Sequence, residues 1–196
     1  MPLNEGKIPR SAFPTDFGTF TIYGFQESAT GEEAVALVQG DPGAGTAALV
    51  RIHSQCLTGD VFGSHRCDCG AQLQAALKKI AAETSGVLLY QMQEGRGIGL
   101  INKLMAYELQ DRGVDTVEAN ERLGFAADQR DYQFCGDILK YLGAGTIRLL
   151  SNNPAKKEGL EREGIRVEAM VPLKVRHSWR ADSYIRTKRE KMGHLL

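Results

Sequence analysis

The sequence lacks the long apolar segments that mark secreted and membrane proteins. Its first thirty residues contain no apolar signal core, and no apolar run approaches the roughly 18 residues that a membrane-spanning helix needs. Net charge is also absent, since 24 basic residues balance 24 acidic ones, so no overall field attracts nucleic acid or an anionic membrane. The 4 cysteines are too few for a disulfide-rich scaffold. These absences favour a cytoplasmic protein without nucleic-acid or membrane partners.

The composition that remains is typical of a globular protein, with 42% hydrophobic and 24% charged residues in a chain of 196. That length supports one large domain or two small ones with a substantial core. We predict an α+β fold in a single compact domain, whose β-rich N-terminal part packs with alternating strands and helices. The expected boundaries are a loose N-terminus at 1–12, the domain at 13–175 and a C-terminal tail at 176–196. Strands are expected at 18–25, 33–39, 47–53, 86–92 and 147–150, and helices at 72–82, 100–109, 128–142 and 155–163.

Three of the cysteines fall in one short segment between an expected strand and an expected helix. Cys56, Cys67 and Cys69 offer three soft ligands, which suit zinc, and three protein ligands leave a fourth position open for water. Two alternatives remain. Cys56 could form a disulfide with Cys67 or Cys69, or a closed four-ligand site could include His53 or His65.

Two turns between a strand and a helix could bind an anion. The Gly-rich turn at 95–99 could direct backbone N–H groups at a phosphate, assisted by the guanidinium of Arg96, or it could be only a tight turn. Ser151 opens a Ser-Asn-Asn-Pro segment close to Lys156, which could hold an anion or simply cap the next helix.

Further polar residues have both an ordinary and a functional interpretation. Asp128 could cap the expected helix, with its charge in solvent, or act as a carboxylate base paired with Arg130. Tyr107 follows the Gly-rich turn and could be an ordinary half-buried tyrosine. Cys135 lies among apolar residues and is expected to be a buried core thiol. Lys188 opens a mixed-charge segment that is expected to be a solvated chain end.

Seven motifs in a fixed order make the chain resemble the GTP cyclohydrolase II family. The resemblance covers essentially the whole chain and is to the stand-alone form, without a dihydroxybutanone-phosphate synthase domain before it. The motifs are Arg51-Ile-His-Ser-Gln-Cys-Leu-Thr-Gly-Asp, Arg66-Cys-Asp-Cys-Gly, Gln93-Glu-Gly-Arg-Gly-Ile-Gly-Leu, Asp115-Thr-Val-Glu-Ala-Asn, Leu123-Gly-Phe-Ala-Ala-Asp-Gln-Arg-Asp, Leu150-Ser-Asn-Asn-Pro and Thr187-Lys-x-x-Lys-Met-Gly-His.

The resemblance implies the first committed step of riboflavin biosynthesis. GTP is hydrolysed to 2,5-diamino-6-ribosylamino-4(3H)-pyrimidinone 5′-phosphate, formate and pyrophosphate. It implies one zinc ion per chain, held by Cys56, Cys67 and Cys69 with a water molecule, as well as magnesium with the GTP phosphates and a homodimer. The positions that match GTP contacts are Arg51, Ile52, His53, Ser54, Gln55, Gln72, Glu94, Gly95, Arg96, Thr116, Ser151 and Lys156.

The resemblance also implies catalytic roles. Asp128 matches a proposed proton acceptor, Arg130 an arginine proposed as nucleophile towards the α-phosphate, and Tyr107 a tyrosine of the ring-opening chemistry. A guanidinium keeps its proton, with a pKa above about 12, so we expect Arg130 to stabilise charge on the α-phosphate instead. Tyr107 suits a proton donor for C–N cleavage if it points inward.

Two positions depart from the family pattern. Gln55 stands where glutamate is expected, which removes a charge beside the cysteine segment, and Ser151 stands where threonine is expected. Two other functions remain open. One is an enzyme of the same fold that opens the imidazole ring but retains the formyl group, which the presence of Tyr107 disfavours. The other is a zinc-binding module that only senses nucleotide.

Overall fold

The chain divides into two compact units, each built from segments that are distant in sequence. The computed structural model describes residues 8–126 and 128–195. The unit that we call the sheet unit comprises residues 8–53, 74–92 and 131–173. The second, the helical unit, comprises residues 54–73, 93–126, 128–130 and 174–195.

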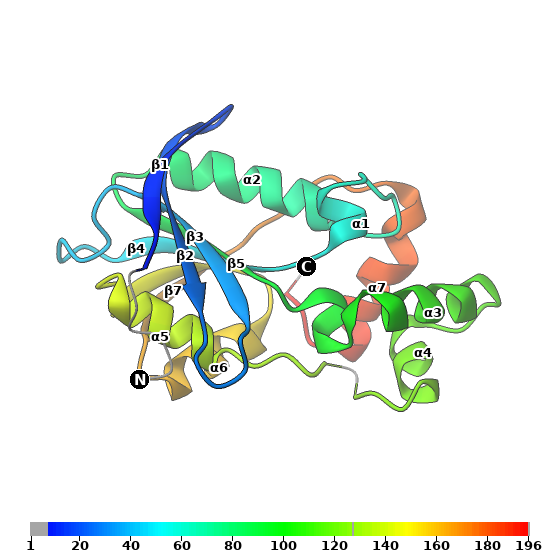
Figure 1. Cartoon of the computed structure of the whole chain (residues 1–196). Helices are drawn as coiled ribbons and strands as arrows, with labels where there is room; N and C mark the ends of the chain where they lie inside the picture. The colour runs from blue at the N-terminus through cyan, green and yellow to red at the C-terminus, as the bar shows by residue number, and fades with distance from the viewer. Residues whose placement is uncertain (1–7, 127, 196) are drawn as a thin grey trace. The chain divides into compact units, whose positions relative to one another are not determined.

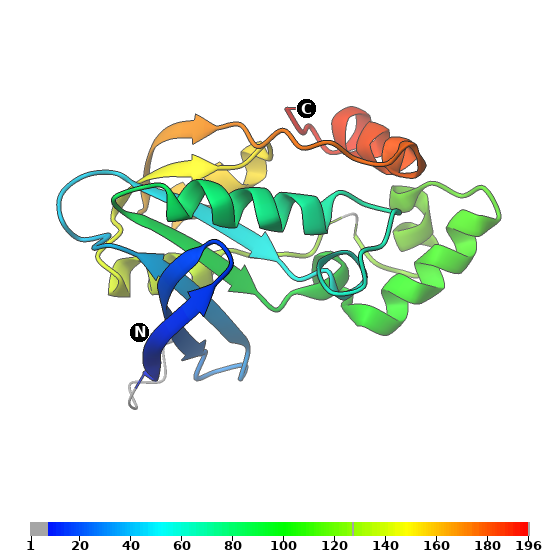
Figure 2. The ribbon, with the colours of Figure 1, turned by 90° about the horizontal axis from the view of Figure 1, so that it is seen from above.

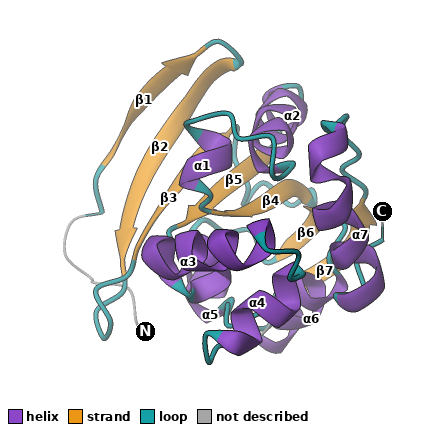
Figure 3. Ribbon diagram, turned by 90° about the vertical axis from the view of Figure 1, so that its right-hand side faces the viewer, coloured by secondary structure: helices purple, strands orange, loops and turns teal. Residues whose placement is uncertain are grey.

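The sheet unit is built around a seven-stranded mixed sheet, drawn in orange in Figure 3. Its strand order is β1-β2-β3-β5-β4-β6-β7 (Figure 3). The first four strands in this order pair antiparallel, whereas β4 pairs parallel with β6, and β6 pairs parallel with β7. The strands are β1 (Arg10–Thr15), β2 (Gly18–Gln26), β3 (Glu33–Gln39), β4 (Ala48–Ser54), β5 (Gly86–Gln91), β6 (Thr146–Leu150) and β7 (Arg166–Val171).

The central strands β4 and β5 are covered on both faces. Residues 48–53 of β4 are all buried, and so are most residues of β5, which is typical of strands with helices on both sides. The part of α2 that belongs to the sheet unit lies along one face of the sheet, and α5 and α6 lie along the other (Figures 1 and 2). By contrast, β1 is an exposed edge strand, and it carries Pro14, which an edge tolerates because it lacks a partner on one side.

The helices of the described chain are divided between the units. Helices α5 and α6 and most of α2 belong to the sheet unit, and the others belong to the helical unit. None of them combines the length and apolar character needed to cross a membrane. The helices are α1 (Leu57–Asp60), α2 (Cys69–Ala81), η1 (Glu94–Gly97), α3 (Gly99–Asp111), α4 (Thr116–Arg122), α5 (Gln133–Tyr141), α6 (Pro154–Arg162), η2 (Trp179–Ala181) and α7 (Asp182–Lys191).

The main hydrophobic core joins α5 to the sheet. Apolar residues of α5 recur on one face of the helix, and Ile138 and Leu139 pack in the same buried cluster as Val50 and Leu89 of the central strands. Cys135 is also in this cluster and is fully buried, which confirms the prediction of a core thiol. Burial raises the pKa of that thiol well above its usual value.

The α+β class predicted from the sequence is confirmed. Strands β2 to β6 and helices α2, α3 and α6 fall within a few residues of their expected positions, and the β-rich N-terminal part joins the rest through the β3–β5 pairing. Strand β7 and helices α1, α4 and α7 were not predicted. Residues 10–12, expected to be loose, belong to β1, and residues 1–7 lie outside the described residues.

Two other expectations were wrong. The helix expected at 128–142 begins only at Gln133, so Asp128 does not cap it. The mixed-charge segment that opens at Lys188, expected to be a solvated chain end, begins within α7 and buries Lys188 within the helical unit. Residue 196 lies outside the described residues.

The fully buried side chain of Leu139 predicts a strong dependence of stability on the α5 core. Leu139→Ala should lower the free energy of unfolding by about 2–5 kcal/mol, because it removes apolar contacts and leaves a cavity. Lys140→Ala, on the exposed side of the same helix, should change it by less than about 0.5 kcal/mol. Urea titrations of both variants would measure the difference, and equal losses would contradict this assignment of the core.

Candidate functional site

The three clustered cysteines converge in the helical unit. Cys56 precedes α1, Cys67 lies in the following loop and Cys69 begins α2. Their sulfur atoms lie within 4.8 Å of one another. All three are free thiols, so the disulfide alternative is wrong. Within residues 8–126 and 128–195, neither His53 nor His65 belongs to this group of ligand atoms. The closed four-ligand site is therefore not formed.

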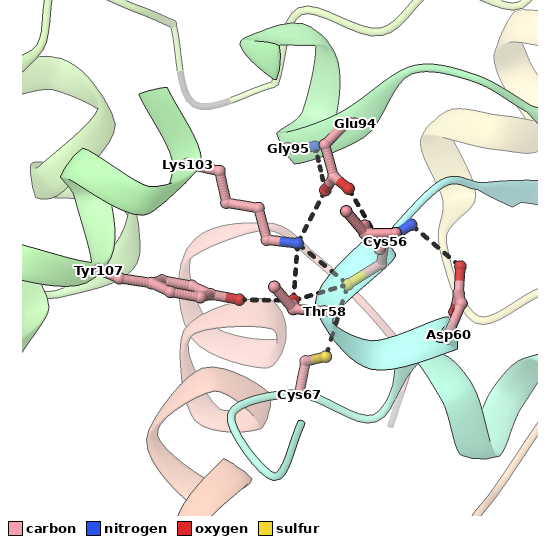
Figure 4. Close-up of polar contacts among 9 residues, drawn as sticks. Cys56, Thr58, Asp60, Cys67, Glu94, Gly95, Lys103 and Tyr107 are labelled. Atoms are coloured by element: carbon pink, nitrogen blue, oxygen red, sulfur yellow. Dashed lines mark hydrogen bonds and ion pairs between the residues drawn. The ribbon is translucent and has the colours of Figure 1, made fainter. Parts of the chain in front are cut away.

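The thiol cluster fits a zinc ion by its distances and by the space that it leaves. Tetrahedral Zn–S bonds of about 2.3 Å would place two sulfurs roughly 3.8 Å apart, and the sulfurs of Cys56 and Cys67 are 3.7 Å apart (Figure 4). Gly59 keeps the cluster open, because a Cβ there would lie 2.8 Å from the sulfur of Cys67 and 3.2 Å from that of Cys56. A Cβ at Gly70 would lie 2.3 Å from the carbonyl oxygen of Gly59. The close approach of α1 and α2 therefore requires glycine at position 70.

A buried ion pair supports the thiol cluster from the Gly-rich segment. The ammonium of Lys103 on α3 lies 3.1 Å from the sulfur of Cys56, 3.0 Å from the hydroxyl of Thr58 and 2.7 Å from Glu94 (Figure 4). The carboxylate of Glu94 also accepts hydrogen bonds from the backbone N–H groups of Leu57 and Gly95. Glu94 therefore ties the Gly-rich turn to the cysteine segment.

Lys103 was not predicted to be a site residue, although its position in the sequence relative to Tyr107 was a signal for it. It lies one helical turn before Tyr107, and residues four apart on a helix share a face. Burial alone would lower the pKa of Lys103, but the charge of Cys56 and the hydrogen bond with Glu94 outweigh it and raise that pKa. The ammonium is therefore a fixed positive charge beside the sulfurs.

The negative charge of the free cluster is concentrated on one sulfur. Hydrogen bonds from the Cys67 and Cys69 thiols, together with the charge of Lys103, lower the pKa of Cys56. The hydrogen bond with Cys56 in turn raises the pKa of Cys67 to about 11, and the same contact raises that of Cys69 well above its usual value. One thiolate and two thiols thus share the cluster near neutral pH.

Tyr107 points towards the cysteine segment. Its hydroxyl lies 3.2 Å from the hydroxyl of Thr58, which lies 3.6 Å from the sulfur of Cys56 (Figure 4). The guanidinium of Arg66 lies over the tyrosine ring, 4.8 Å from its centroid. Burial raises the pKa of Tyr107, so the phenol keeps its proton at neutral pH.

The Gly-rich turn connects a strand to a helix, as expected. Gly95 and Arg96 both adopt left-handed backbone conformations, with φ of 64° and 65°, and Gly97 follows with φ of 94°. A left-handed arginine is uncommon, and backbone strain of this kind clusters at functional sites. The side chain of Arg96 extends to the ring of Tyr184 on α7, 5.7 Å from its centroid.

Asp128 and Arg130 form a two-point ion pair. The Nε of Arg130 donates to Asp128 at 2.8 Å, a second guanidinium nitrogen donates to the other carboxylate oxygen, and a third donates to the hydroxyl of Ser54 at 3.2 Å. Burial alone would raise the pKa of Asp128, but the hydrogen bonds and charge of Arg130 outweigh it and lower that pKa. The carboxylate is therefore ionised at neutral pH and orients the guanidinium.

The remaining predicted contacts in the helical unit have different neighbours. The amide of Gln72 donates to Asp68 at 2.5 Å. Thr116 begins α4, next to its capping residue Asp115. Gln55 is half-buried beside Cys56.

In the sheet unit, predicted nucleotide contacts gather where β4 and β6 end. The guanidinium of Arg51 donates to the carbonyl of Leu150 at 3.1 Å, and the ammonium of Lys156 donates to that of Ile52 at 2.8 Å. Both cations are nearly fully buried, and the carbonyls that they contact lie near the carboxyl ends of β6 and β4, the edge at which open sheets bind ligands. The ring of His53 stacks on Tyr90, with centroids 5.6 Å apart.

Ser151 and its neighbours also form the cap of α6. The side chain of Asn153 caps this helix, with Pro154 in its first turn. Ser151 accepts a hydrogen bond from the backbone N–H of Asn153 at 3.1 Å. The capping interpretation is thus confirmed, with Asn153 as the capping residue.

Fold and site together define an α+β protein with three clustered thiols, beside a Gly-rich turn, that could hold a metal ion. The family profile described as GTP cyclohydrolase II matches residues 6–172. The GTP cyclohydrolase-2 of Pseudomonas putida (strain W619) is 56% identical over 189 residues, which cover 96% of this chain and 92% of that protein. The chain belongs to the GTP cyclohydrolase II family.

Other relatives are longer. The riboflavin biosynthesis protein RibBA of Bacillus subtilis (strain 168) is 58% identical over 184 residues, which are 93% of this chain and 46% of that protein. Among solved structures, a two-domain 3,4-dihydroxy-2-butanone 4-phosphate synthase from A. baumannii aligns with a TM-score of 0.47 and 20% identity, over 87% of this chain and 41% of that one. The structural likeness is too distant to bear on function.

Because a side chain at position 59 would meet the sulfurs of the cluster, metal binding should be sensitive to substitution of Gly59. Gly59→Ala should greatly reduce the zinc retained per chain, because the added methyl group would contact the sulfurs. Gly145→Ala, which would place its methyl group in open space, is the matched control. Elemental analysis after dialysis would measure zinc in both variants, and normal zinc in Gly59→Ala would contradict the assigned cluster.

The pKa values of the cluster predict that zinc binding releases protons. Cys56 is already a thiolate, whereas Cys67 and Cys69 carry protons at neutral pH and must lose them on coordination, so about two protons should be released per zinc at pH 7. Affinity should therefore weaken as pH falls. Calorimetric titrations in buffers of different ionisation enthalpy would count the protons, and a count near zero would contradict this charge distribution.

Proposed function

We propose that this protein hydrolyses GTP to 2,5-diamino-6-ribosylamino-4(3H)-pyrimidinone 5′-phosphate, formate and pyrophosphate, the first committed step of riboflavin biosynthesis. The observation that carries the proposal is the open three-thiol cluster with the hydroxyl of Tyr107 directed towards it through Thr58. The identity of 56% with a GTP cyclohydrolase-2 over 92% of its length supports the same reaction.

Zinc would be held by Cys56, Cys67 and Cys69, and it supplies Lewis acidity that lowers the pKa of a water molecule for attack on C8 of guanine. Tyr107 would donate a proton to the departing ring nitrogen, a role that its raised pKa supports because the phenol stays protonated. Lys103 would offset the negative charge of the sulfurs from its position near Cys56.

Arg130 would stabilise charge on the α-phosphate while pyrophosphate leaves. The bidentate contact with Asp128 disfavours loss of its proton, which argues against a nucleophilic guanidine. Asp128 would keep the planar group oriented and would be the proton acceptor, a role that its ionised state permits. A phosphoguanidinium adduct trapped on Arg130 would overturn this assignment.

GTP contacts are proposed for residues of both units. The buried cations Arg51 and Lys156 support binding of an anion in the sheet unit. In the Gly-rich turn, the side chain of Glu94 is engaged by protein donors, so we assign nucleotide contact to the backbone of residues 94–96 and to the guanidinium of Arg96. The other proposed contacts are Ile52, His53, Ser54, Gln55, Gln72, Thr116 and Ser151.

The proposal extends to a second metal, an assembly and a compartment. Magnesium would accompany the triphosphate, since oxygen-rich phosphates are its usual ligands. A homodimer is supported by the exposed apolar side chains of Ile101, Leu104 and Met105 on α3. Free thiols at the metal site support the reducing environment of the cytoplasm.

The direct test is to identify the products of GTP. Zinc-loaded protein would be mixed with GTP and magnesium, and the products resolved by mass spectrometry. The diaminopyrimidine monophosphate with formate and pyrophosphate is the expected result. A formylated pyrimidine would instead indicate an enzyme that stops after ring opening, and unchanged GTP with zinc bound would indicate a nucleotide-sensing module.

The two-point contact of the planar Arg130 guanidinium predicts that a positive charge alone at this position is not sufficient for catalysis. Arg130→Lys should lower kcat by about a hundredfold or more, because lysine cannot reproduce the two-point geometry, while zinc content stays unchanged. Arg122→Lys, the same substitution in an exposed ion pair on α4, should leave kcat unchanged. Steady-state rates measure both variants, and an Arg130→Lys enzyme with kcat within twofold of the wild type would contradict this role.

A further inference from the structure

Helix α7 carries a buried charge that the proposed reaction does not use. The helix lies beyond residues 6–172, which match the family profile. Most of its basic side chains are exposed, as in a solvated chain end, but the side chain of Lys188 is only 9% exposed. Burying an ammonium is costly unless it is paired and hydrogen-bonded. The partner of Lys188 therefore indicates which segment α7 keeps in place.

The partner of Lys188 lies inside the cysteine segment. Its ammonium is 2.7 Å from a carboxylate oxygen of Asp68, whose side chain is 3% exposed. Asp68 is the residue between Cys67 and Cys69, so the ion pair fixes the peptide that joins two of the three thiols. The other carboxylate oxygen of Asp68 accepts from the amide of Gln72 at 2.5 Å, one of the proposed GTP contacts.

The same face of α7 also reaches the Gly-rich turn. Tyr184 lies one helical turn before Lys188, and the ammonium lies 4.5 Å from the centroid of its ring. The guanidinium of Arg96 lies 5.7 Å from that centroid. One helix face thus contacts both the cysteine segment and the strained turn at Arg96.

We propose that Lys188 is a positioning residue for the metal site: through its ion pair with Asp68, helix α7 holds Cys67 and Cys69 at the separation that a metal ion requires. A buried ion pair gains little net stability over apolar packing, whereas partners behind a metal's ligands strongly affect affinity. The role of this pair is therefore to fix geometry. The inference rests on the zinc site of the proposed function.

The test measures metal affinity rather than catalysis. Zinc affinity would be determined on the full chain by competition with a chromogenic chelator, and thiolate coordination would be followed by the absorption of bound Co²⁺. Lys188→Met should weaken zinc binding by about tenfold or more and alter the Co²⁺ spectrum. Lys191→Met is the matched control, because Lys191 lies on the same helix and its ion-pair partner is Asp115, in a half-exposed contact. Its affinity and spectrum should match the wild type.

A second substitution separates positioning from a general loss of folding. Asp68→Asn keeps the shape of the side chain and removes its charge, so it should weaken zinc binding even if Lys188→Met fails to fold. Because Lys188 acts through Asp68, the double variant should bind zinc no more weakly than the weaker of the two single variants. Circular dichroism would confirm that each variant is folded.

The outcomes distinguish this inference from the proposed function. A folded Lys188→Met or Asp68→Asn protein that binds zinc within twofold of the wild type would overturn the positioning role and leave the proposed reaction intact. Additive losses in the double variant would also overturn it. A wild-type protein that binds no zinc would overturn the metal site itself, and this inference with it.

Discussion

The helical unit is organised by the need to hold three sulfur atoms within a few ångströms of one another. Such a cluster gathers negative charge whenever its thiols ionise, and negative charge in a partly buried site must be compensated. Lys103 supplies a cation next to Cys56. Glycines supply the space, because the contact between α1 and α2 at Gly59 and Gly70 excludes any side chain. The cluster of three sulfurs thus requires a cation and glycines as its neighbours.

The local parts of this arrangement could be predicted from the sequence. Cys56, Cys67 and Cys69 are close in sequence, and the Gly-rich turn follows a strand and opens a helix, so spacing and order were sufficient. The buried strands β4 and β5 were predicted for the same reason, since an apolar run is a property of neighbouring residues. Signals of this kind need no knowledge of which distant segments meet.

Features that depend on distant partners could not be predicted. Lys188 and Asp68 are 120 residues apart, and the polar sequence of α7 resembles a solvated helix until its partner is known. The start of α5 was misplaced because Asp128 is a favourable capping residue by type, but its carboxylate is occupied by Arg130. Side-chain pairing thus overrode local propensity.

The left-handed backbone of Arg96 has a consequence for the stability of the protein as a whole. A non-glycine residue in this conformation costs on the order of 1 kcal/mol or more, and glycine at position 96 would relieve it. Selection for stability alone would therefore favour losing the guanidinium. Natural proteins are held only to a stability threshold, so the chain can carry this cost at position 96. If Arg96 contacts the nucleotide as proposed, a search for thermostable variants of this chain would encounter position 96 as a site where stability and activity oppose each other.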